Sequence, residues 1–468
     1  MCESDCAGHS GGRGVTLMRI RLGKRAGGWI VRLLLATCAA AALPLAAVPA
    51  ANAVNLKRNG IIFVHGIEGS GAQFESQALR FTSNGYSPAW IDEVDYNSTR
   101  AVGDKSQVFE QIDAAVAAMK ARTHRPQVDI VAHSLGTSVM YDYLTEGEKA
   151  AERKANVGHY INVDGQSENP GVPTLAVWAG RGTPGRSMEG AENVTIPNQT
   201  HVQTCTSAQS FIQYFKFLRG VPPKRDITRQ REIHIAGKVV NFPENTGGSG
   251  DTLEVWKVDS NGKRTTPSPD YTIPINDGSE GGGNWGPVLV QRKQRYEFAV
   301  VQPGVGALHY YYEPFVRSDY TLRLEVSAAL EQDTGNRPGA AGSVMIRYKE
   351  YWGDQAGESD RLMIDGLNVC TEELCPASKQ VNAYFAYDVN RNGKTDLTAD
   401  PSIGSLPFLQ AADVFVRGAT PTDETISYQL ESRGAPGVIR TLNVPNWESK
   451  PVGDGIVIQW NDFESLSF

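Results

Sequence analysis

The chain has 468 residues, of which 40% are hydrophobic and 21% charged, and its formal net charge is −7. At about 100–200 residues per domain, this length suggests two or three domains. The composition is that of a globular protein and excludes a disordered chain or a multi-spanning membrane protein, and the acidic balance gives no electrostatic reason to bind nucleic acid. The 48 glycines and 25 prolines indicate many turns, and therefore a sizeable β component.

The first 53 residues have the pattern of a secretory signal peptide. Basic residues between positions 19 and 32 precede the apolar run 33–48, and small residues at 51–53 offer a cleavage site before Val54. The alternative is a membrane anchor, but the run has 16 residues with a proline inside, short of the roughly 20 that a spanning helix needs. Met18 is an alternative start of translation. We therefore expect a secreted protein, extracellular or periplasmic, with no stable membrane span and a net charge of −11 after cleavage.

Residues 54–222 alternate between short apolar strands and amphipathic helices. In the segment 106–121, for example, Val108, Ile112, Val116 and Met119 recur at helical spacing. Short apolar strands separated by helices predict an α/β domain with a parallel sheet covered on both faces. Strands are expected at 61–66, 128–134, 159–165, 174–180 and 193–198, and helices at 106–121 and 206–220.

The pattern changes after the proline-containing linker 219–226. Segments such as TLEVWKV, RYEFAVV and SVMIRYKEYW alternate apolar with polar residues, and turns rich in Gly, Asn, Asp and Pro separate them. This predicts an all-β C-terminal region over 223–468, an antiparallel sandwich or barrel. Because about 240 residues is large for one sandwich, we expect two β subdomains with a break near 309–314.

The stretch VDIVAHSLGTSVMYDYL at 128–144 places a serine where a predicted strand turns into a predicted helix. Such a turn exposes the residue at its tip above the carboxyl edge of the sheet, where the N–H groups of the new helix face any anion that develops. The backbones crowd there, so small residues are needed two positions before and after the serine, and Ala132 and Gly136 meet that demand. The motif therefore indicates that Ser134 is a nucleophile, and the alternative is a serine that caps a helix.

A nucleophilic serine needs a base and an acid that orients the base, in the chain order Ser, Asp or Glu, His on this type of fold. His201 lies in the loop between the last predicted strand and the last helix, from which it can reach back to Ser134. Asp164 stands at the carboxyl end of a predicted strand, and we predict that it is the acid. The usual place for the acid is the loop after the next strand, where Glu189 and Glu192 remain as alternatives.

Two backbone amides are expected to form the oxyanion hole. One belongs to Leu135, directly after the nucleophile, and the other to Ile67, in the loop after the first strand. Glycines at 66, 69 and 71 allow this loop to lie close to a substrate. His65 precedes Ser134 in the chain, so we expect it to order the loop by side-chain hydrogen bonds rather than to act as the base.

These motifs resemble those of a known family. VHG at 64–66 followed by isoleucine, and AHSLG at 132–136, are similar to the motifs of the compact secreted lipases of the α/β-hydrolase superfamily. The early acid, and a small hydrolase domain followed by a β domain of similar length, resemble the two-domain lipase group best known from an archaeal long-chain lipase. The resemblance implies carboxylester hydrolysis, with the β domain helping to bind an apolar acyl chain or a lipid surface.

The expected function is therefore that of a secreted lipase that cleaves acylglycerol esters, at a lipid–water interface, through Ser134, His201 and Asp164, with no cofactor required. Close alternatives are a depolymerase of aliphatic polyesters and a general short-chain esterase. An alternative of another class is a binding protein with an inactive hydrolase domain, against which the complete set of three residues argues. The sequence leaves the acyl-chain preference, a lid and the oligomeric state open.

Three cysteines follow the predicted signal peptide. Cys370 and Cys375 are close enough in the chain to form a short disulfide loop in an oxidising compartment, which leaves Cys205 unpaired. A zinc site is the weaker interpretation, because no nearby His or Cys supplies two more ligands. This cysteine usage fits export.

The segment DVNRNGKTD at 388–396 spaces oxygen-bearing side chains like those of a calcium loop. The twelfth position of such a loop is Ala399 rather than Glu, and a hairpin turn through NRNG explains the same letters. A structural calcium ion and a plain turn therefore remain as two interpretations. The ligands in the first would be Asp388, Asn390, Asn392 and Asp396.

Overall fold

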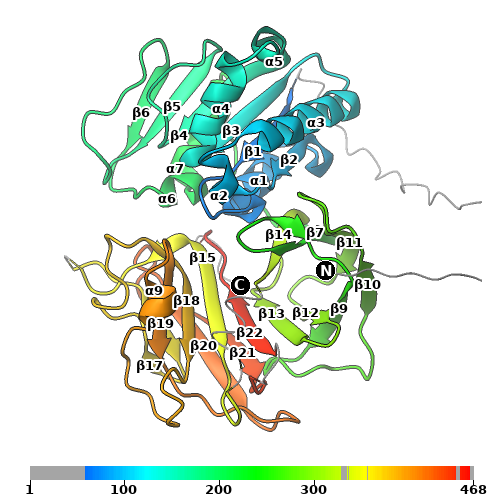
Figure 1. The fold of residues 1–468 in the computed structure, drawn as a ribbon, viewed down its shortest axis with the longest axis vertical. Helices are drawn as coiled ribbons and strands as arrows, with labels where there is room; N and C mark the ends of the chain where they lie inside the picture. Colours follow the sequence, from blue (N-terminus) through cyan, green and yellow to red (C-terminus); the bar gives the residue numbers. More distant parts are fainter. Residues whose placement is uncertain (1–57, 328–334, 336, 356, 450–453, 464–468) are drawn as a thin grey trace, which may run out of the picture. The chain divides into compact units, whose positions relative to one another are not determined.

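The computed structural model describes residues 58–327, 335, 337–355, 357–449 and 454–463 (Figure 1). The predicted signal peptide at 1–53 and the alternative start at Met18 lie outside the described residues. Within the described part of the chain, no helix is long and apolar enough to cross a membrane. The described residues all fall within one structural unit, Asn55–Phe468, in which an α/β region precedes a β-rich region.

The α/β region is built on a six-stranded parallel sheet with the strand order β2-β1-β3-β4-β5-β6. This confirms the α/β class and the parallel sheet that the sequence predicts. The strands are β1 (Gly60–Val64), β2 (Ile91–Val94), β3 (Val128–His133), β4 (Val157–Val163), β5 (Thr174–Ala179) and β6 (Glu192–Ile196). The helices are η1 (Gly71–Phe74), α1 (Glu75–Ser83), η2 (Pro88–Trp90), α2 (Ser98–Ala101), α3 (Ser106–Thr123), α4 (Leu135–Thr145), α5 (Ala150–Asn156), α6 (Gln203–Thr206) and α7 (Ala208–Arg219).

Helices cover both faces of this sheet, because successive residues of a strand point to opposite sides. On one face, Ile62 of β1 belongs to the same core as Ile112 of α3, and α4 contributes to it as well. On the other face, Phe63 belongs to a core with Phe81 of α1 and with side chains of α7. The inner strands β1, β3, β4 and β5 are therefore nearly continuous apolar runs, which explains why they could be located from sequence. The edge strand β2 has the sequence IDEV and is not among the predicted strands.

The β-rich region contains, within the described residues, an eight-stranded sheet and two four-stranded sheets. Their strand orders are β10-β9-β12-β13-β22-β15-β18-β19, then β11-β7-β14 with β8 paired to β7, and β17-β16-β20-β21. The elements are β7 (Ile233–Asn241), β8 (Thr246–Gly247), β9 (Asp251–Val258), β10 (Tyr271–Ile275), β11 (Asn284–Val290), β12 (Arg295–Gln302), β13 (Gly306–Tyr312), β14 (Asp319–Val326), β15 (Ser343–Tyr351), β16 (Arg361–Ile364), β17 (Leu367–Asn368), β18 (Val381–Tyr387), α9 (Pro401–Gly404), β19 (Leu409–Asp413), β20 (Thr425–Glu431), β21 (Ile439–Pro445) and β22 (Gly455–Gln459).

The prediction of a β-rich C-terminal region is confirmed, but several neighbouring strands run parallel rather than antiparallel. Strand β22 is parallel to both β13 and β15, and β7 with β14 and β18 with β19 are also parallel pairs. The alternation of apolar and polar residues indicates which face of a strand is buried, and it carries no information about the direction of the neighbouring strand. The expectation of a purely antiparallel sandwich is corrected accordingly.

The predicted break at 309–314 does not divide the β region. Residues 309–312 lie in β13, which is paired with β12 on one side and with β22 on the other. Tyr310 and Tyr312 pack in a core formed mainly by residues 233–326, whereas Tyr311 belongs to a second core formed mainly by residues 341–460. Because β13 is buried on both faces, it joins the two cores, and the chain passes from one to the other between β14 and β15.

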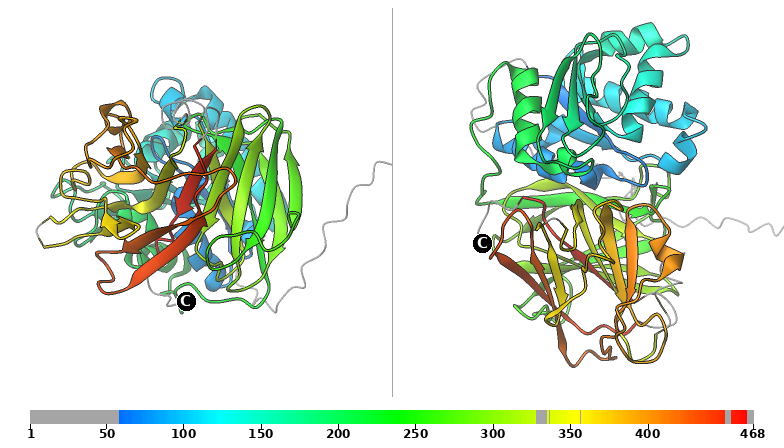
Figure 2. Two further views of the ribbon diagram at one scale, coloured as in Figure 1. Left: turned by 90° about the horizontal axis from the view of Figure 1, so that it is seen from below. Right: turned by 90° about the vertical axis from the view of Figure 1, so that its left-hand side faces the viewer.

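Strands β7 and β14 lie at the side of the β region that is next to the α/β region (Figure 2), and β14 contacts η1 and α1. Side chains of both strands tie the two regions together. Arg323 on β14 forms a bidentate ion pair with Asp95, just after β2, through contacts of 3.0 and 2.8 Å. Lys238 on β7 reaches the same carboxylate at 2.6 Å. Burial alone would raise the pKa of Asp95, but the two cations hold it well below its usual value. Asp95 in turn accepts a hydrogen bond from the Gly71 amide at 2.8 Å. The β region is therefore linked through Asp95 to the loop after β1, at the carboxyl edge of the sheet.

Candidate active site

The predicted nucleophile stands at the junction of β3 and α4. Ser134 has φ 51° and ψ −121°, a strained backbone that few residues other than glycine adopt. Its amide donates to the Val163 carbonyl at 3.1 Å, which holds the turn against β4. A Cβ on Gly136 would lie 2.4 Å from the His65 carbonyl oxygen, so this position must be glycine. The structure therefore has the sharp strand-to-helix turn that the sequence predicts, with Ser134 at its tip.

The predicted acid and base contact each other. Asp164 directly follows β4, and its Oδ2 accepts a hydrogen bond from His201 Nδ1 at 2.6 Å. Its Oδ1 accepts the Ala179 amide and Arg186 Nη1, both at 3.0 Å. Burial alone would raise the pKa of Asp164, but the hydrogen bonds from His201 and Ala179 and the charge of Arg186 outweigh it and lower the pKa. Asp164 is therefore held as an anion beside the imidazole.

The alternative acids lie elsewhere. Glu189 and Glu192 are exposed, and in the described part of the chain the carboxylate that contacts His201 belongs to Asp164. Ser134 and His201 line the same cavity without a hydrogen bond between them in this conformation of the described residues. Such a bond is often long in a ligand-free active site and shortens when substrate binds.

The two predicted oxyanion amides are free to donate. Within the described residues, neither the Ile67 amide nor the Leu135 amide has a hydrogen-bond acceptor. A Cβ on Gly66 would lie 3.1 Å from Ser134 Cβ, so the loop after β1 runs directly against the nucleophile. Leu135 is the first residue of α4, where the helix dipole adds to the attraction for an anion.

His65 orders the oxyanion loop, as the sequence predicts. Its Nδ1 is 2.7 Å from the Gly66 carbonyl, and its ring stacks on Tyr96 with centroids 4.3 Å apart. Tyr96 also donates its hydroxyl to the His65 carbonyl at 2.8 Å. Burial lowers the pKa of His65 to about 4, so the ring is neutral under ordinary conditions. The sequence did not reveal Asn245 of the β region, whose amide contacts the Gly69 carbonyl at 2.8 Å and His65 Nε2 at 3.3 Å.

A second unpredicted link joins the oxyanion loop to the loop of the candidate base. Gln73 Oε1 accepts the Gly66 amide at 3.3 Å, while its Nε2 donates to His133 Nδ1 at 2.7 Å. His133 Nε2 then donates to the His201 carbonyl at 3.1 Å. Burial, with a smaller contribution from the neighbouring His201, lowers the pKa of His133 well below its usual value, which keeps the ring neutral in this role. The sequence could not reveal this link, because the seven-residue spacing between Gly66 and Gln73 matches no local motif.

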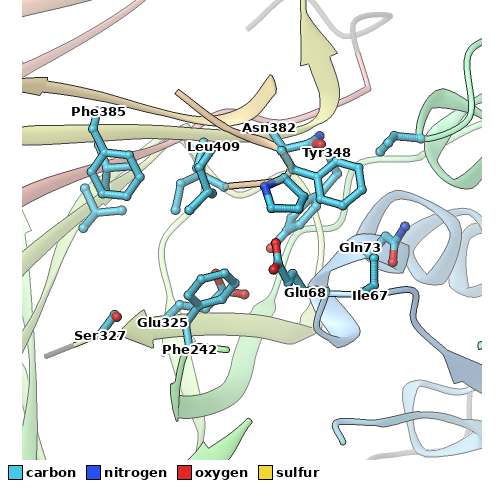
Figure 3. Close-up of a pocket in the computed structure, with 18 of the residues that line it drawn as sticks. Ile67, Glu68, Gln73, Phe242, Glu325, Ser327, Tyr348, Asn382, Phe385 and Leu409 are labelled. Atoms are coloured by element: carbon cyan, nitrogen blue, oxygen red, sulfur yellow. The ribbon is translucent and has the colours of Figure 1, made fainter. Parts of the chain in front are cut away.

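A cavity of about 150 Å³ extends from Ser134 and His201 into the β region (Figure 3). In Figure 3, Ile67 and Gln73 lie at one side of the cavity, and Phe385 and Ser327 lie at the other. Most of the lining beyond the candidate triad is apolar and comes from the strands and loops of the β region, including Phe242, Leu308, Val344, Phe385, Leu409 and Ile456. The exceptions include Glu68 and Glu325, and the Glu325 carboxylate accepts Ser70 Oγ at 2.7 Å. This largely apolar lining suits an apolar ligand group.

The segment 388–396 closes on itself. Asp388 accepts the amides of Asn392 and Gly393 at 3.1 and 3.0 Å, and Asn390 donates its side-chain amide to Asp413. Within the described residues, no group of three or more His, Cys, Asp or Glu side chains could hold a metal ion. A structural calcium ion held by Asp388, Asn390, Asn392 and Asp396 stays a prediction. The hairpin alternative is wrong, because the flanking strands β18 and β19 are parallel, and the segment is a turn within a longer connection.

The cysteines pair as the sequence suggested. Cys370 and Cys375 form a disulfide with their Cα atoms 5.4 Å apart, within the core formed mainly by residues 341–460. Cys205 is a buried free thiol in the α/β region. It lies near the candidate site, where Gln73 Nε2 contacts its sulfur at 3.5 Å.

Three family models match the chain in succession. The class 2 lipase family matches residues 58–237, the lipase C-terminal domain family matches residues 231–329, and a further C-terminal domain family matches residues 329–464. The resemblance to two-domain lipases that the motifs indicate is therefore confirmed. The comparison with curated proteins gave no match.

Solved structures match at low similarity. Lipase B of Aspergillus fumigatus is 11% identical over 36% of this chain and 54% of its own, with a TM-score of 0.29, so the chain spans about half the length of that lipase. Phospholipase PlaB from Legionella pneumophila is 10% identical over 53% of this chain and 86% of its own, with a TM-score of 0.26. These scores carry no argument about activity.

Proposed function

Because the chain carries a class 2 lipase domain followed by a lipase C-terminal domain, we propose that it is a secreted lipase that hydrolyses acylglycerol esters through Ser134, His201 and Asp164. The observation that carries the proposal is the hydrogen bond between His201 and Asp164, with His201 and Ser134 on the wall of one largely apolar cavity. A strained serine, a base and an oriented acid are the parts of a nucleophilic acyl-transfer site, and the apolar cavity suits a fatty acyl chain.

In the proposed mechanism, His201 Nε2 takes the proton of Ser134 as Oγ attacks the ester carbonyl. The amides of Ile67 and Leu135 hold the oxyanion of the tetrahedral intermediate, and removing one such donor costs on the order of 10²–10³ in rate. The protonated His201 gives its proton to the leaving alcohol, which leaves an acyl group on Ser134. A water molecule that loses a proton to His201 then releases the fatty acid, and Ser134 recovers its proton.

The proposal also includes activity without a cofactor and export of the protein. The scheme needs no cofactor, because the base and the amides supply all the proton transfers and charge stabilisation. Export is supported by the signal-peptide pattern of residues 1–53 and by the Cys370–Cys375 disulfide, since disulfides persist mainly in oxidising compartments.

The test is hydrolysis of p-nitrophenyl esters from acetate to palmitate, with Ser134→Ala as the control. We expect kcat/KM to rise toward long chains and activity to be absent in the variant. Activity confined to short chains would indicate a general esterase instead, and hydrolysis of polyester granules in preference to acylglycerols would indicate a depolymerase. Activity at no chain length would favour a binding protein with an inactive hydrolase domain.

A further inference from the structure

A guanidinium lies against the carboxylate assigned as the acid. Arg186 Nη1 donates to Asp164 Oδ1 at 3.0 Å, and Nη2 donates to the Gly165 carbonyl. The other carboxylate oxygen, Oδ2, accepts His201 Nδ1 at 2.6 Å. The Asp164 carboxylate is therefore held on one oxygen by the imidazole and on the other by Arg186, and its side chain is only 4% exposed.

Arg186 is fixed in place although it comes from a mostly exposed loop between β5 and β6. Its guanidinium carbon lies 4.3 Å from the centroid of the buried Trp178 ring. Trp178 Nε1 donates to Asn193 Oδ1 at 3.0 Å, and the Asn193 amide also closes the loop by contacts of 2.8 and 2.9 Å with the backbone of Met188. A guanidinium that stacks on a ring and forks onto two acceptors is pre-organised for one geometry.

Within the described chain, Arg186 is the basic side chain other than His201 that forms an ion pair with Asp164. Two carboxylates lie further off: Glu68 lines the same cavity as His201, and Glu350 interacts electrostatically with Cys205. The other titratable groups near the pair are His133, Cys205 and Tyr214. Burial lowers the pKa of His133 and raises the pKa values of Cys205 and Tyr214 well away from neutral pH, so all three are uncharged. A change in the charge at position 186 should therefore act directly on the pair.

We propose that Arg186 is a positioning residue of the triad, which fixes the plane of the Asp164 carboxylate toward His201 and opposes protonation of the imidazole. This inference rests on the proposed function. The two effects have different signatures. Loss of the fork lets the carboxylate rotate, which slows the chemical step, whereas loss of the cation favours the imidazolium and moves the acid limb of the activity profile to higher pH.

The test compares Arg186→Met and Arg186→Lys with the wild-type chain by measuring kcat and kcat/KM for one p-nitrophenyl ester across the pH range. For Arg186→Met we expect kcat to fall about tenfold with little change in KM, and the acid limb to move up by roughly half to one pH unit. For Arg186→Lys we expect the acid limb to stay in place while kcat falls, because an ammonium keeps the charge without the fork.

The matched control is Arg181→Met in the same loop. Arg181 pairs with Glu358 at 2.7 Å, lies over Trp352 and donates from Nε to the Asn198 carbonyl at 3.0 Å. Because its side chain forms no hydrogen bond or ion pair with Asp164 or His201 in the described chain, neither kcat nor the acid limb should change. A fall in kcat for Arg186→Met without any movement of the acid limb, or an equal effect of Arg181→Met, would overturn the proposal in favour of a purely structural role for the loop.

A second readout needs no substrate and separates this inference from the proposed function. The downfield proton resonance of His201 Nδ1–H can be followed by NMR as a function of pH. Its midpoint should be higher in Arg186→Met than in the wild-type chain or in Arg186→Lys. If the wild-type chain hydrolyses no ester, the proposed function fails while this midpoint still tests Arg186, and an unchanged midpoint in Arg186→Met overturns the inference.

Discussion

The α/β region and the β region contribute different parts of the candidate site. Strands β1, β3 and β5 are buried along their whole length. The candidate nucleophile, acid and base follow the carboxyl ends of β3, β4 and β6. Strands such as β7 and β9 alternate buried and half-buried residues, and they carry no candidate for a chemical step. Yet Arg323, Lys238 and Asn245 of the β region hold the loops around the oxyanion site, and most of the apolar cavity wall belongs to it.

This comparison indicates that the candidate chemical groups lie in the α/β region, whereas part of the support for their loops and most of the cavity wall lie in the β region. A change at the triad should remove activity and leave the fold intact. A change at the contacts between the regions should reduce stability first, and a change in the cavity wall should alter substrate choice alone. The four predictions below test these distinctions, from the largest expected effect to the smallest.

The largest effect is expected from Asp164→Asn. The amide would favour the wrong tautomer of His201 and would not stabilise the imidazolium, so kcat should fall roughly 10⁴-fold with little change in the melting temperature. The measurement is ester hydrolysis together with thermal unfolding. Glu189→Gln and Glu192→Gln are the matched controls, and if either one abolished activity while Asp164→Asn did not, the acid would have been assigned wrongly.

Next comes Arg323→Met on β14. It would leave the buried Asp95 carboxylate with Lys238 as its remaining cationic partner, so the free energy of unfolding should fall by about 3–5 kcal/mol. Denaturant unfolding measures this directly. Arg361→Met removes an exposed ion pair with Glu431 and should cost about 1 kcal/mol or less.

The double variant Arg323→Met/Asp95→Asn tests the Arg323 prediction in a second way. Asp95→Asn removes the buried negative charge, so the double variant should recover part of the stability that Arg323→Met loses. If Arg323→Met were no more destabilising than Arg361→Met, the β region would not be anchored through this ion pair.

The third prediction concerns acid stability of the α/β region. A histidine in the unfolded chain titrates near pH 6.5, whereas burial lowers the pKa of folded His65 to about 4. Above pH 6.5 the ring is neutral in both states. As the pH falls from 6.5 to 4 the unfolded chain gains a proton that the folded chain does not, so the free energy of unfolding should fall by about 3 kcal/mol at pH 4.

The check is denaturant unfolding at several pH values in this window for the wild-type chain, His65→Gln and His234→Gln. The His65→Gln variant should lose much of the pH dependence, whereas His234→Gln, at a half-exposed position on β7, should keep it. Equal pH dependence in all three proteins would count against a buried, neutral His65.

The smallest effect should be confined to substrate choice. Val344 of β15 lines the cavity, so Val344→Phe should shorten the space for an acyl chain by a few methylene groups. At about 0.8 kcal/mol for each buried methylene, the preference for palmitate over butyrate should fall roughly 10- to 100-fold while butyrate hydrolysis stays nearly constant. Leu289→Phe, at an exposed site on β11, is the control. A parallel fall for both esters would argue against an acyl site in this cavity.

The parts of the fold and the site that could be predicted from sequence are those with local signals. The apolar strands of the α/β region, the turn at Ser134 and the order of Asp164 and His201 all follow from short segments. Asn245, by contrast, contacts His65 across 180 residues of chain, and Arg186 lies in a loop whose sequence offers acidic alternatives to Asp164 but no signal for a cation at the site. No local pattern marks either one.

The β region shows the same limit at the level of the fold. The alternation of apolar and polar residues indicates where its strands lie. The position of β22 between β13 and β15, however, depends on pairing between segments far apart in the chain. The segment 309–314 is predicted to hold a boundary between two β subdomains, but Tyr310 to Tyr312 lie within strand β13. The structure buries these rings alternately in two cores, and only tertiary packing could have distinguished the two cases.

The most direct test of the central claim is covalent labelling with p-nitrophenyl alkylphosphonates of short and long chain, followed by peptide mapping. The account predicts one phosphonate per chain, attached to Ser134, with the long-chain reagent reacting faster and no labelling in Ser134→Ala. Labelling at another residue, or no labelling of the folded wild-type chain, would contradict the assignment of Ser134 as the nucleophile at the head of an acyl cavity.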